Sequence, residues 1–459
     1  MTTLQEAQAP QARRLILEAI RAGLRDSSRV RYTVYMYLAS RVLYLVIAAV
    51  SMAVLHLVGS HTGLSGAHNW EGNPLGQSTL GSEMSNWDGR WYLLTSQTGY
   101  FHHVVPHAGS YTTLGFMPLY PMLMWVLAQV IGYFGAGLLI AMVSGGIATI
   151  LVGQLAEQWW GAERARRAIA FWCFFPGTIV FSMVYSEGPT IALIAGSMIL
   201  LQRKQWLWAG VCAGFATAIA PTALSAVPMC AAAALLEIYR SGSREDRAPH
   251  SLIETPRSLI ETPRSLLERS RSLLDVVRRG WRDHEARRSL IAPILAPAGA
   301  IGFGIYLWIW TGSPLSDYTA QHIEWSEYTT PLAVPRVAIH VIHQLYISGV
   351  GTHGPGGIDL NGVLALLGTA FLLWGFKLLW EHRARVPLTA WVWTVCVSVL
   401  ALTSANTPPN PRLLVLAFPL VLAAGATLTR HGHRRAMWWT IFATVVMSPL
   451  TYVGTWLRP

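Results

Sequence analysis

Long apolar runs separated by short polar segments make up most of the chain. A helix that crosses a bilayer needs roughly 20 mostly apolar residues. Runs of about this length lie at 35–58, 137–157, 168–185, 188–202, 291–311, 361–380, 386–403, 412–429 and 436–456. A longer run, 206–236, contains Pro221, which removes a backbone donor and predicts two short spans. The pattern predicts an all-α polytopic membrane protein with about eleven transmembrane helices.

One further apolar run, 114–134, is better explained as an interfacial or re-entrant helix in an outer loop. Cytoplasmic segments of membrane proteins carry an excess of Lys and Arg. If 114–134 crossed the membrane fully, the cluster of Arg164, Arg166 and Arg167 would lie outside. If it lies along the interface, that cluster falls on the cytoplasmic side, as does the basic pair that begins at Arg203. The charges therefore favour the interfacial interpretation.

The same charge asymmetry divides the chain into segments. We expect a cytoplasmic tail over 1–33, a transmembrane module over 34–236 with a catalytic outer loop at 59–113, a cytoplasmic basic insertion over 237–290, and a second transmembrane module over 291–459 with an outer loop at 312–360. Within the insertion, residues 251–278 repeat a seven-residue unit that begins as SLIETPR. Prolines at 256 and 263 interrupt a helix there, which favours a surface insertion near anionic lipid over a coiled coil.

Composition supports a membrane protein and excludes several other classes. Only 12% of the residues are charged, against about 25% in soluble domains, which excludes a water-exposed globule. The net charge of +11 comes from basic residues between apolar runs, so it indicates topology and not nucleic-acid binding. The four cysteines lie in apolar runs without paired spacing, as is typical of small core residues. We expect no disulfide, metal or cofactor.

One charged residue is a candidate for chemistry by its surroundings. Asp88 lies in the outer-loop string Asn86-Trp-Asp-Gly-Arg-Trp-Tyr-Leu-Leu94, where a carboxylate between aromatic residues can act as a general base or cap a helix. Glu187 precedes a Gly-Pro pair, which is typical of an acid in the first turn of a helix. Arg412 adjoins the membrane, where an arginine can extend to the interface.

Histidines are frequent in the two outer loops, but they do not form a metal-binding pattern. His340 and His343 have helical spacing and lack an acidic or cysteine partner nearby in sequence. His322 lies close to Asp317 and Glu324 and is a candidate for lining an acceptor site.

Short motifs in a fixed order carry a family resemblance. They are Trp87-Asp88, Gly99-Tyr100, Phe116-Met117-Pro118-Leu119-Tyr120-Pro121, Phe175-Pro176 before Tyr185-Ser186-Glu187, Trp206 to Pro228 with its central proline, and Pro411-Arg412-Leu413-Leu414 before Phe418-Pro419. In this order the chain resembles the PIG-V family of the GT-C superfamily. These are multispanning mannosyltransferases that add the second mannose in glycosylphosphatidylinositol anchor assembly, together with bacterial relatives. The resemblance covers most of the chain outside 240–290.

The resemblance implies roles for individual residues. Asp88 matches the acidic residue that activates the acceptor hydroxyl, Glu187 a second polar position of the cavity, and Arg412 a basic residue facing the donor phosphate. Two positions depart from the pattern: Ala220 stands where many relatives have Arg before proline, and Arg90 stands where His is more usual. We expect Arg90 to replace the missing phosphate contact. Further substrate-binding candidates are Trp87, Tyr92, Tyr100, Tyr120 and His322.

The resulting expectation is an inverting mannosyltransferase in a bacterial plasma membrane, with its site facing outside. The family implies a polyprenyl-phosphate-mannose donor and a glycolipid or lipoglycan acceptor. Two alternatives stay open: a GT-C enzyme that uses another polyprenyl-phosphate sugar, and a lipid or sugar transporter without chemistry. Against a transporter, the acidic residues concentrate in outer loops and the two halves share no repeat.

Overall fold

The computed structural model describes residues 27–62, 80–100, 112–245, 275–276, 278–344 and 359–452. The segments 63–79 and 101–111 of the expected outer loop 59–113, the tail 1–26 and the repeats 251–274 lie outside the described residues. The α-helices are α2 Ser27–Thr62, α3 Leu80–Glu83, α4 Asp88–Thr98, α5 Leu119–Trp160, α6 Ala162–Cys173, α7 Glu187–Gln202, α8 Trp206–Thr217, α9 Ala226–Glu245, α11 His284–Arg288, α12 Ile291–Leu295, α13 Ala298–Thr311, α14 Ser316–Ile323, α15 Ala333–His343, α16 Leu360–Glu381, α17 Leu388–Thr403, α18 Pro411–Leu416, α19 Phe418–Thr427 and α20 Arg430–Tyr452. Three 3-10 helices are η2 Thr113–Gly115, η3 Pro176–Ser182 and η4 Pro221–Ser225.

The protein is helical throughout its described part, and it is multi-pass. Four helices there are long and apolar enough to cross a membrane: Arg29–Val54, Leu119–Trp160, Pro221–Ser243 and Leu360–Glu381. Two bent pairs, η3 with α7 and the helices on either side of Pro297, raise this number to six. Three shorter apolar helices accompany them. The expected count of about eleven spans is not confirmed.

Proline and glycine break several runs that hydropathy alone treats as continuous. The single helix expected over 168–185 is wrong: α6 ends at Cys173, and η3 then meets α7 at 107°. Pro176 has no amide hydrogen, and Phe175 before it takes an extended conformation with ψ 131°. The run 412–429 is likewise divided into α18 and α19 beside Pro419. The break expected at Pro221 is confirmed by η4 between α8 and α9.

The run 114–134 enters the long helix α5, which is interrupted at Gly132 by a φ of 73°. Its first part, residues 119–131, is about 20 Å long at 1.5 Å per residue, too short to cross a bilayer alone. This length agrees with an interfacial or re-entrant segment.

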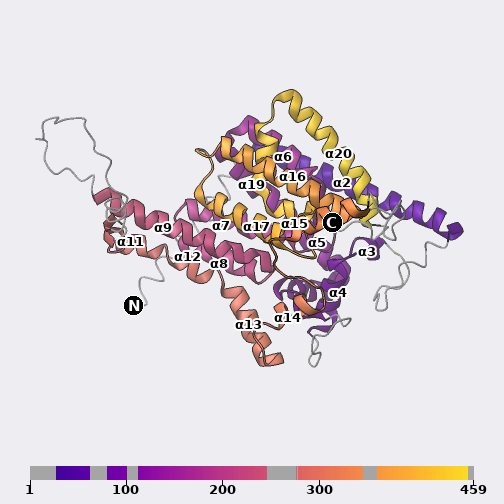
Figure 1. Ribbon diagram of the computed structural model, residues 1–459, viewed down its shortest axis with the longest axis horizontal. Helices are drawn as coiled ribbons and strands as arrows, with labels where there is room; N and C mark the ends of the chain where they lie inside the picture. The colour runs from indigo at the N-terminus through magenta and orange to yellow at the C-terminus, as the bar shows by residue number, and fades with distance from the viewer. Residues whose placement is uncertain are drawn as a thin grey trace, which may run out of the picture.

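The helices pack around a core that lies between α5, α6, α7 and α19 (Figure 1). Many of its buried positions are alanine, which lets helix backbones approach closely. The short helix α4 packs on α5, while α14 lies against η2 near the lower edge of the molecule in Figure 1. The helix α18 contacts η3. Through these contacts the starts of α4, α7 and α18 come together.

Candidate active site

Asp88 is the first residue of α4 and follows a strained residue. Trp87, which precedes the helix, has φ 61° and ψ −125°, a conformation that non-glycine residues rarely adopt. Such strain persists only where surrounding contacts hold it, and it clusters at functional sites. Here the Tyr185 hydroxyl accepts a hydrogen bond from the Asp88 amide at 3.2 Å and donates to the Asn86 carbonyl at 3.2 Å. The Tyr185 hydroxyl therefore holds the turn at the residue before Trp87 and at the residue after it.

Arg412 lies in the first turn of α18, whose start is well defined. The Asn410 side chain caps this helix by accepting from the Leu413 amide at 2.9 Å, and Pro411 occupies the first turn. The start of α18 lies directly against η3: a Cβ at Gly177 would be 1.9 Å from the Pro411 carbonyl oxygen. A glycine at 177 is thus required for the approach that brings Arg412 beside the start of α7.

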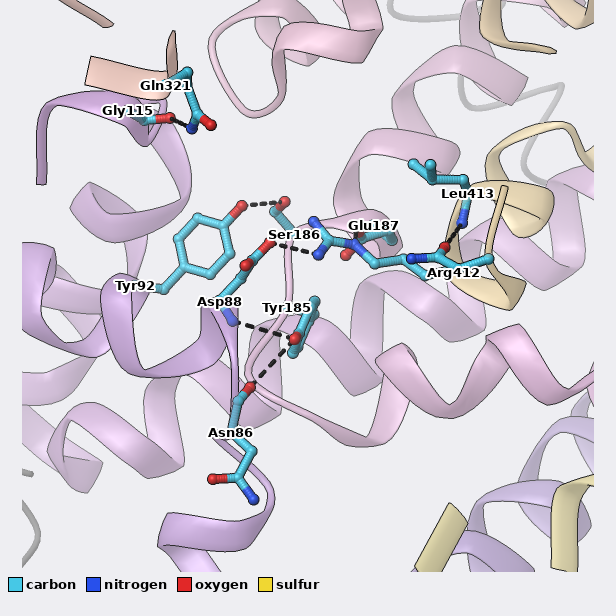
Figure 2. A network of polar contacts seen from close by, with 11 residues as sticks. Asn86, Asp88, Tyr92, Gly115, Tyr185, Ser186, Glu187, Gln321, Arg412 and Leu413 are labelled. Carbon is cyan, nitrogen blue, oxygen red and sulfur yellow. Dashed lines mark hydrogen bonds and ion pairs between the residues drawn. The ribbon is translucent and has the colours of Figure 1, made fainter. Parts of the chain in front are cut away.

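The guanidinium of Arg412 joins two carboxylates that are far away in sequence (Figure 2). Its Nη1 donates to Asp88 Oδ2, and its Nε donates to Glu187 Oε1. The side chain of Glu187 is only 4% exposed and that of Arg412 18%, whereas Asp88 is 31% exposed. We call Asp88, Glu187 and Arg412 the charge triad. The triad therefore has two acidic side chains for one basic side chain.

Several hydrogen-bonding atoms of the triad have no partner within the described part of the chain. These are Glu187 Oε2, which is buried, Asp88 Oδ1 and Arg412 Nη2. A buried polar atom without a partner is costly unless a ligand or water satisfies it. One acceptor on each acid and one donor on the arginine are therefore available to a bound molecule.

The triad decides between the interpretations that the sequence left open. Asp88 as a helix cap is wrong, because Trp87 is the residue before α4 and no side chain caps the helix. The guanidinium of Arg412 points to the two acids. Glu187 does begin α7, a position that the helix dipole favours for an acid, and it also pairs with Arg412.

Tyrosine side chains form one wall next to the triad. The hydroxyl of Tyr92 shares a hydrogen bond of 2.7 Å with Ser186 Oγ, and Tyr120 donates to the Gly137 carbonyl at 2.9 Å. Their rings meet edge to face at 4.9 Å. Burial and the nearby carboxylate of Glu187 raise the pKa of the Tyr92 phenol, so it keeps its proton at physiological pH.

Other predicted site residues lie outside the triad. Arg90 donates to Asn86 Oδ1 at 2.5 Å, and Asn86 Nδ2 in turn donates to Glu83 at 3.0 Å. Burial raises the pKa of Glu83 to about 7. His322 is exposed on α14 and its ring contacts Tyr318 and Tyr328. Neither Arg90 nor His322 contacts Arg412.

Tyr100 lines a cavity of about 580 Å³ at the far end of α4 from Asp88. Other lining residues are Thr95, Ser96, Trp125, Phe303 and Tyr306. The Tyr100 hydroxyl donates to the Phe116 carbonyl at 2.7 Å, and its ring lies 5.3 Å from that of Phe303. The cavity is mostly apolar, with four aromatic side chains and a few hydroxyl groups from α4.

The segment 324–327, which follows α14, connects α4 and η2 with the segment before α18. Glu324 accepts from the amide of Thr112 at 2.7 Å, just before η2. Glu327 accepts from Ser404 Oγ at 2.8 Å and from the Ala405 amide at 3.1 Å, in the segment that leads to α18. Between them, the Trp325 ring packs edge to face on Trp91 of α4 at 5.1 Å. Segment 324–327 thereby fixes α4 relative to the segment before Arg412.

Tyr185, Ser186 and Asn86 are functional candidates that the sequence analysis did not select. All three belong to the quoted motifs, so the motif positions next to Asp88 and Glu187 were the available signal. Within the described ranges, no group of three or more His, Cys, Asp or Glu side chains is arranged to hold a metal ion.

Comparison with known proteins gives distant structural likenesses. No protein-family model matches the sequence. No curated protein matches it either. Similar solved structures include the Archaeoglobus fulgidus oligosaccharyltransferase in its apo form, with a TM-score of 0.41, 13% identity and coverage of 91% of this chain. The same archaeal enzyme, AglB, in complex with an inhibitory peptide and a dolichol-phosphate gives a TM-score of 0.41, 12% identity and 92% coverage.

The chain spans 56% of the length of these archaeal proteins. A likeness of this size carries no argument about chemistry. The function proposed below rests on the side chains of the site and on the sequence motifs.

Proposed function

We propose that this protein is a membrane glycosyltransferase of the GT-C type. It transfers mannose from a polyprenyl-phosphate-mannose donor to a hydroxyl group of a glycolipid or lipoglycan acceptor. The observation that carries the proposal is the charge triad, in which a partly exposed carboxylate and a buried guanidinium meet in a helical membrane protein. The motif resemblance to the PIG-V family selects the donor sugar.

Asp88 serves as the general base in this proposal. Its Oδ2 is fixed by Arg412, and the side chain is 31% exposed, which leaves Oδ1 to accept the proton of an acceptor hydroxyl. The acceptor oxygen forms a bond to the anomeric carbon while the bond from that carbon to the phosphate oxygen breaks. The configuration inverts, and the polyprenyl phosphate leaves with the bonding electrons. A phosphate is a good leaving group, so no general acid is required.

Arg412 stabilises the phosphate. Its Nη2 has no acceptor within the described part of the chain, and its planar guanidinium suits a phosphate oxygen. Glu187 holds the guanidinium in orientation through Nε, and its Oε2 is available to a sugar hydroxyl. Each group of the triad is therefore positioned by at least one contact and keeps one polar atom for substrate.

The lipid part of a substrate requires an apolar surface close to α4. The mostly apolar cavity that Tyr100 lines meets this requirement and begins where α4 ends. Trp87, Tyr92 and Tyr120 would then line the path between the cavity and the triad.

The proposed topology follows the charge asymmetry. The tail 1–33 and the insertion 237–290 are cytoplasmic, and the outer loops 59–113 and 312–360 carry the site on the outer face of a bacterial plasma membrane. The modules 34–236 and 291–459 contribute Asp88 with Glu187 and Arg412, respectively. A site built from both modules accounts for the length of the transmembrane region.

The test is Asp88→Asn in purified protein, with radiolabelled polyprenyl-phosphate-mannose and lipid acceptors. Asn keeps the shape and one hydrogen-bond acceptor but abolishes basicity. Turnover is expected to fall about a hundredfold or more while folded yield and donor binding persist. Asp317→Asn, which removes an outer-loop carboxylate outside the triad, is the matched control.

Near wild-type turnover of Asp88→Asn would remove Asp88 from the mechanism. Transfer of arabinose or glucose instead of mannose would keep the enzyme class and change the donor. If the wild-type protein transfers no sugar but moves lipid or sugar across vesicles, the transporter alternative replaces this proposal.

A further inference from the structure

We propose that Tyr185 is a positioning residue that sets Asp88 and Arg412 relative to each other. The inference rests on the function proposed above and assigns a residue that acts on both members of the reacting pair. Tyr185 lies in the short segment between η3 and α7, and its side chain is fully buried.

The hydroxyl of Tyr185 acts on Asp88. It donates its single proton to the Asn86 carbonyl and accepts from the Asp88 amide, both at 3.2 Å (Figure 2). These two backbone groups flank Trp87, the residue with positive φ. A conformation of this kind returns to a relaxed one unless its neighbours hold it. The hydroxyl therefore supplies a restraint that keeps the Asp88 carboxylate directed at the triad.

The ring of Tyr185 acts on Arg412. The guanidinium carbon lies 4.9 Å from the ring centroid, within the range of a cation–π contact. This contact holds the plane of the guanidinium while Nη1 and Nε engage the two acids. One side chain thus fixes the proposed base with its hydroxyl and the proposed phosphate ligand with its ring.

The partner of the hydroxyl is itself rigid. Asn86 donates through Nδ2 to Glu83 at 3.0 Å and to the Tyr452 carbonyl at 2.6 Å, and its Oδ1 accepts from Arg90. Asn86 is 1% exposed. Because Asn86 is anchored on three sides, the bond to Tyr185 fixes the turn to the protein core and not to a loose loop.

Two substitutions separate the hydroxyl from the ring. Tyr185→Phe removes only the hydroxyl, so kcat should fall about tenfold to a hundredfold while the KM for polyprenyl-phosphate-mannose stays unchanged. Tyr185→Leu also removes the ring, so that KM should rise about fivefold in addition. A residue with a merely structural role would not lower kcat alone in one variant and also raise KM in the other.

Tyr44→Phe is the matched control. Tyr44 is also fully buried, and its hydroxyl donates to the Phe175 carbonyl at 3.0 Å, away from the triad. Its substitution removes the same chemical group from the same core. It should lower stability to a similar extent and leave kcat and donor KM unchanged.

A second readout does not depend on activity. Hydrogen exchange of the Asp88 amide, followed by mass spectrometry of peptides over residues 84–92, should become about fivefold faster in Tyr185→Phe and stay unchanged in Tyr44→Phe. If Tyr185→Phe does not fold, 3-fluorotyrosine at 185 keeps the shape and weakens the acceptor, and smaller changes of the same kind are expected.

The two readouts separate the inference from the proposed function. Faster exchange together with a lower kcat supports the inference. Unchanged exchange, or faster exchange in an enzyme with normal kcat, overturns it. If the wild-type protein transfers no sugar, the proposed function fails and the inference fails with it, whatever the exchange rates; faster exchange then assigns Tyr185 a structural role alone.

Discussion

Removing the guanidinium of Arg412 is expected to destabilise the protein mainly through Glu187. The Glu187 side chain is 4% exposed, and within the described chain its carboxylate has Arg412 as its charge partner. Removing one member of a buried ion pair costs about 3–5 kcal/mol because the other charge stays buried. Asp88 is 31% exposed, so water replaces its lost partner, and loss of the Asp88–Arg412 ion pair adds at most about 1 kcal/mol to the destabilisation. Arg412→Met should therefore lower the free energy of unfolding by about 3–5 kcal/mol.

The assay is denaturant unfolding in one detergent, followed by the fluorescence of the 20 tryptophans. Adding Glu187→Gln to Arg412→Met removes the unpaired charge and should recover most of the loss. Arg430→Met is the control, because it breaks an ion pair with Glu163 whose side chains are 83% and 69% exposed, and it should cost nothing measurable. If Arg412→Met is as stable as Arg430→Met, or if Glu187→Gln recovers nothing, the reasoning from buried charge is wrong.

Four further predictions address the site and the topology. Arg412→Lys keeps the charge but loses the planar guanidinium that can bind two phosphate oxygens, so the KM of the lipid donor should rise more than that of the acceptor. Equal rises in the two KM values would place the arginine away from the phosphate. Gly177→Ala should lower stability and turnover together, since its Cβ would lie 1.9 Å from a backbone oxygen; normal values would show that α18 can shift without consequence. Cysteines introduced at 265 and 317 should differ in their labelling by an impermeant maleimide in intact cells, with only the cysteine at 317 labelled. Labelling of the cysteine at 265 would show that the proposed topology is wrong. Burial raises the pKa of Glu83 from 4.5 to about 7, so the folded protein retains a proton that the unfolded chain loses, and stability should fall as pH rises from about 4.5 through 7. Glu83→Gln should flatten the slope of the unfolding free energy against pH. An unchanged slope would assign the pH dependence to other groups.

The sequence predicted the helical membrane class and the identity of the triad residues, but not their contacts. Asp88, Glu187 and Arg412 were each selected from short motifs. That one guanidinium joins both acids depends on the approach of α18 to η3 at Gly177, across 225 and 324 residues of sequence. Hydropathy has no information about such an approach, because it describes each segment by itself.

The helix count shows the same limit of hydropathy. A window average treats 168–185 as uniformly apolar, yet Pro176 ends a hydrogen-bonded helix within it. The same proline rule predicted the break before Pro221 correctly. The strain at Trp87 had no local signal, since its backbone is set by Tyr185 almost a hundred residues later.

The pairing of Asp88 with Arg412 also has a consequence for biosynthesis. The two residues are 324 positions apart, and at 5–20 residues per second the ribosome needs roughly 16–65 seconds to pass from one to the other. Glu187, 225 residues before Arg412, is synthesised within that time, so both acids are in the chain before their cation. Inserting α7 with its acid unpaired is unfavourable, and the arrival of α18 removes that penalty. The nascent chain therefore cannot complete the site until α18 has been made.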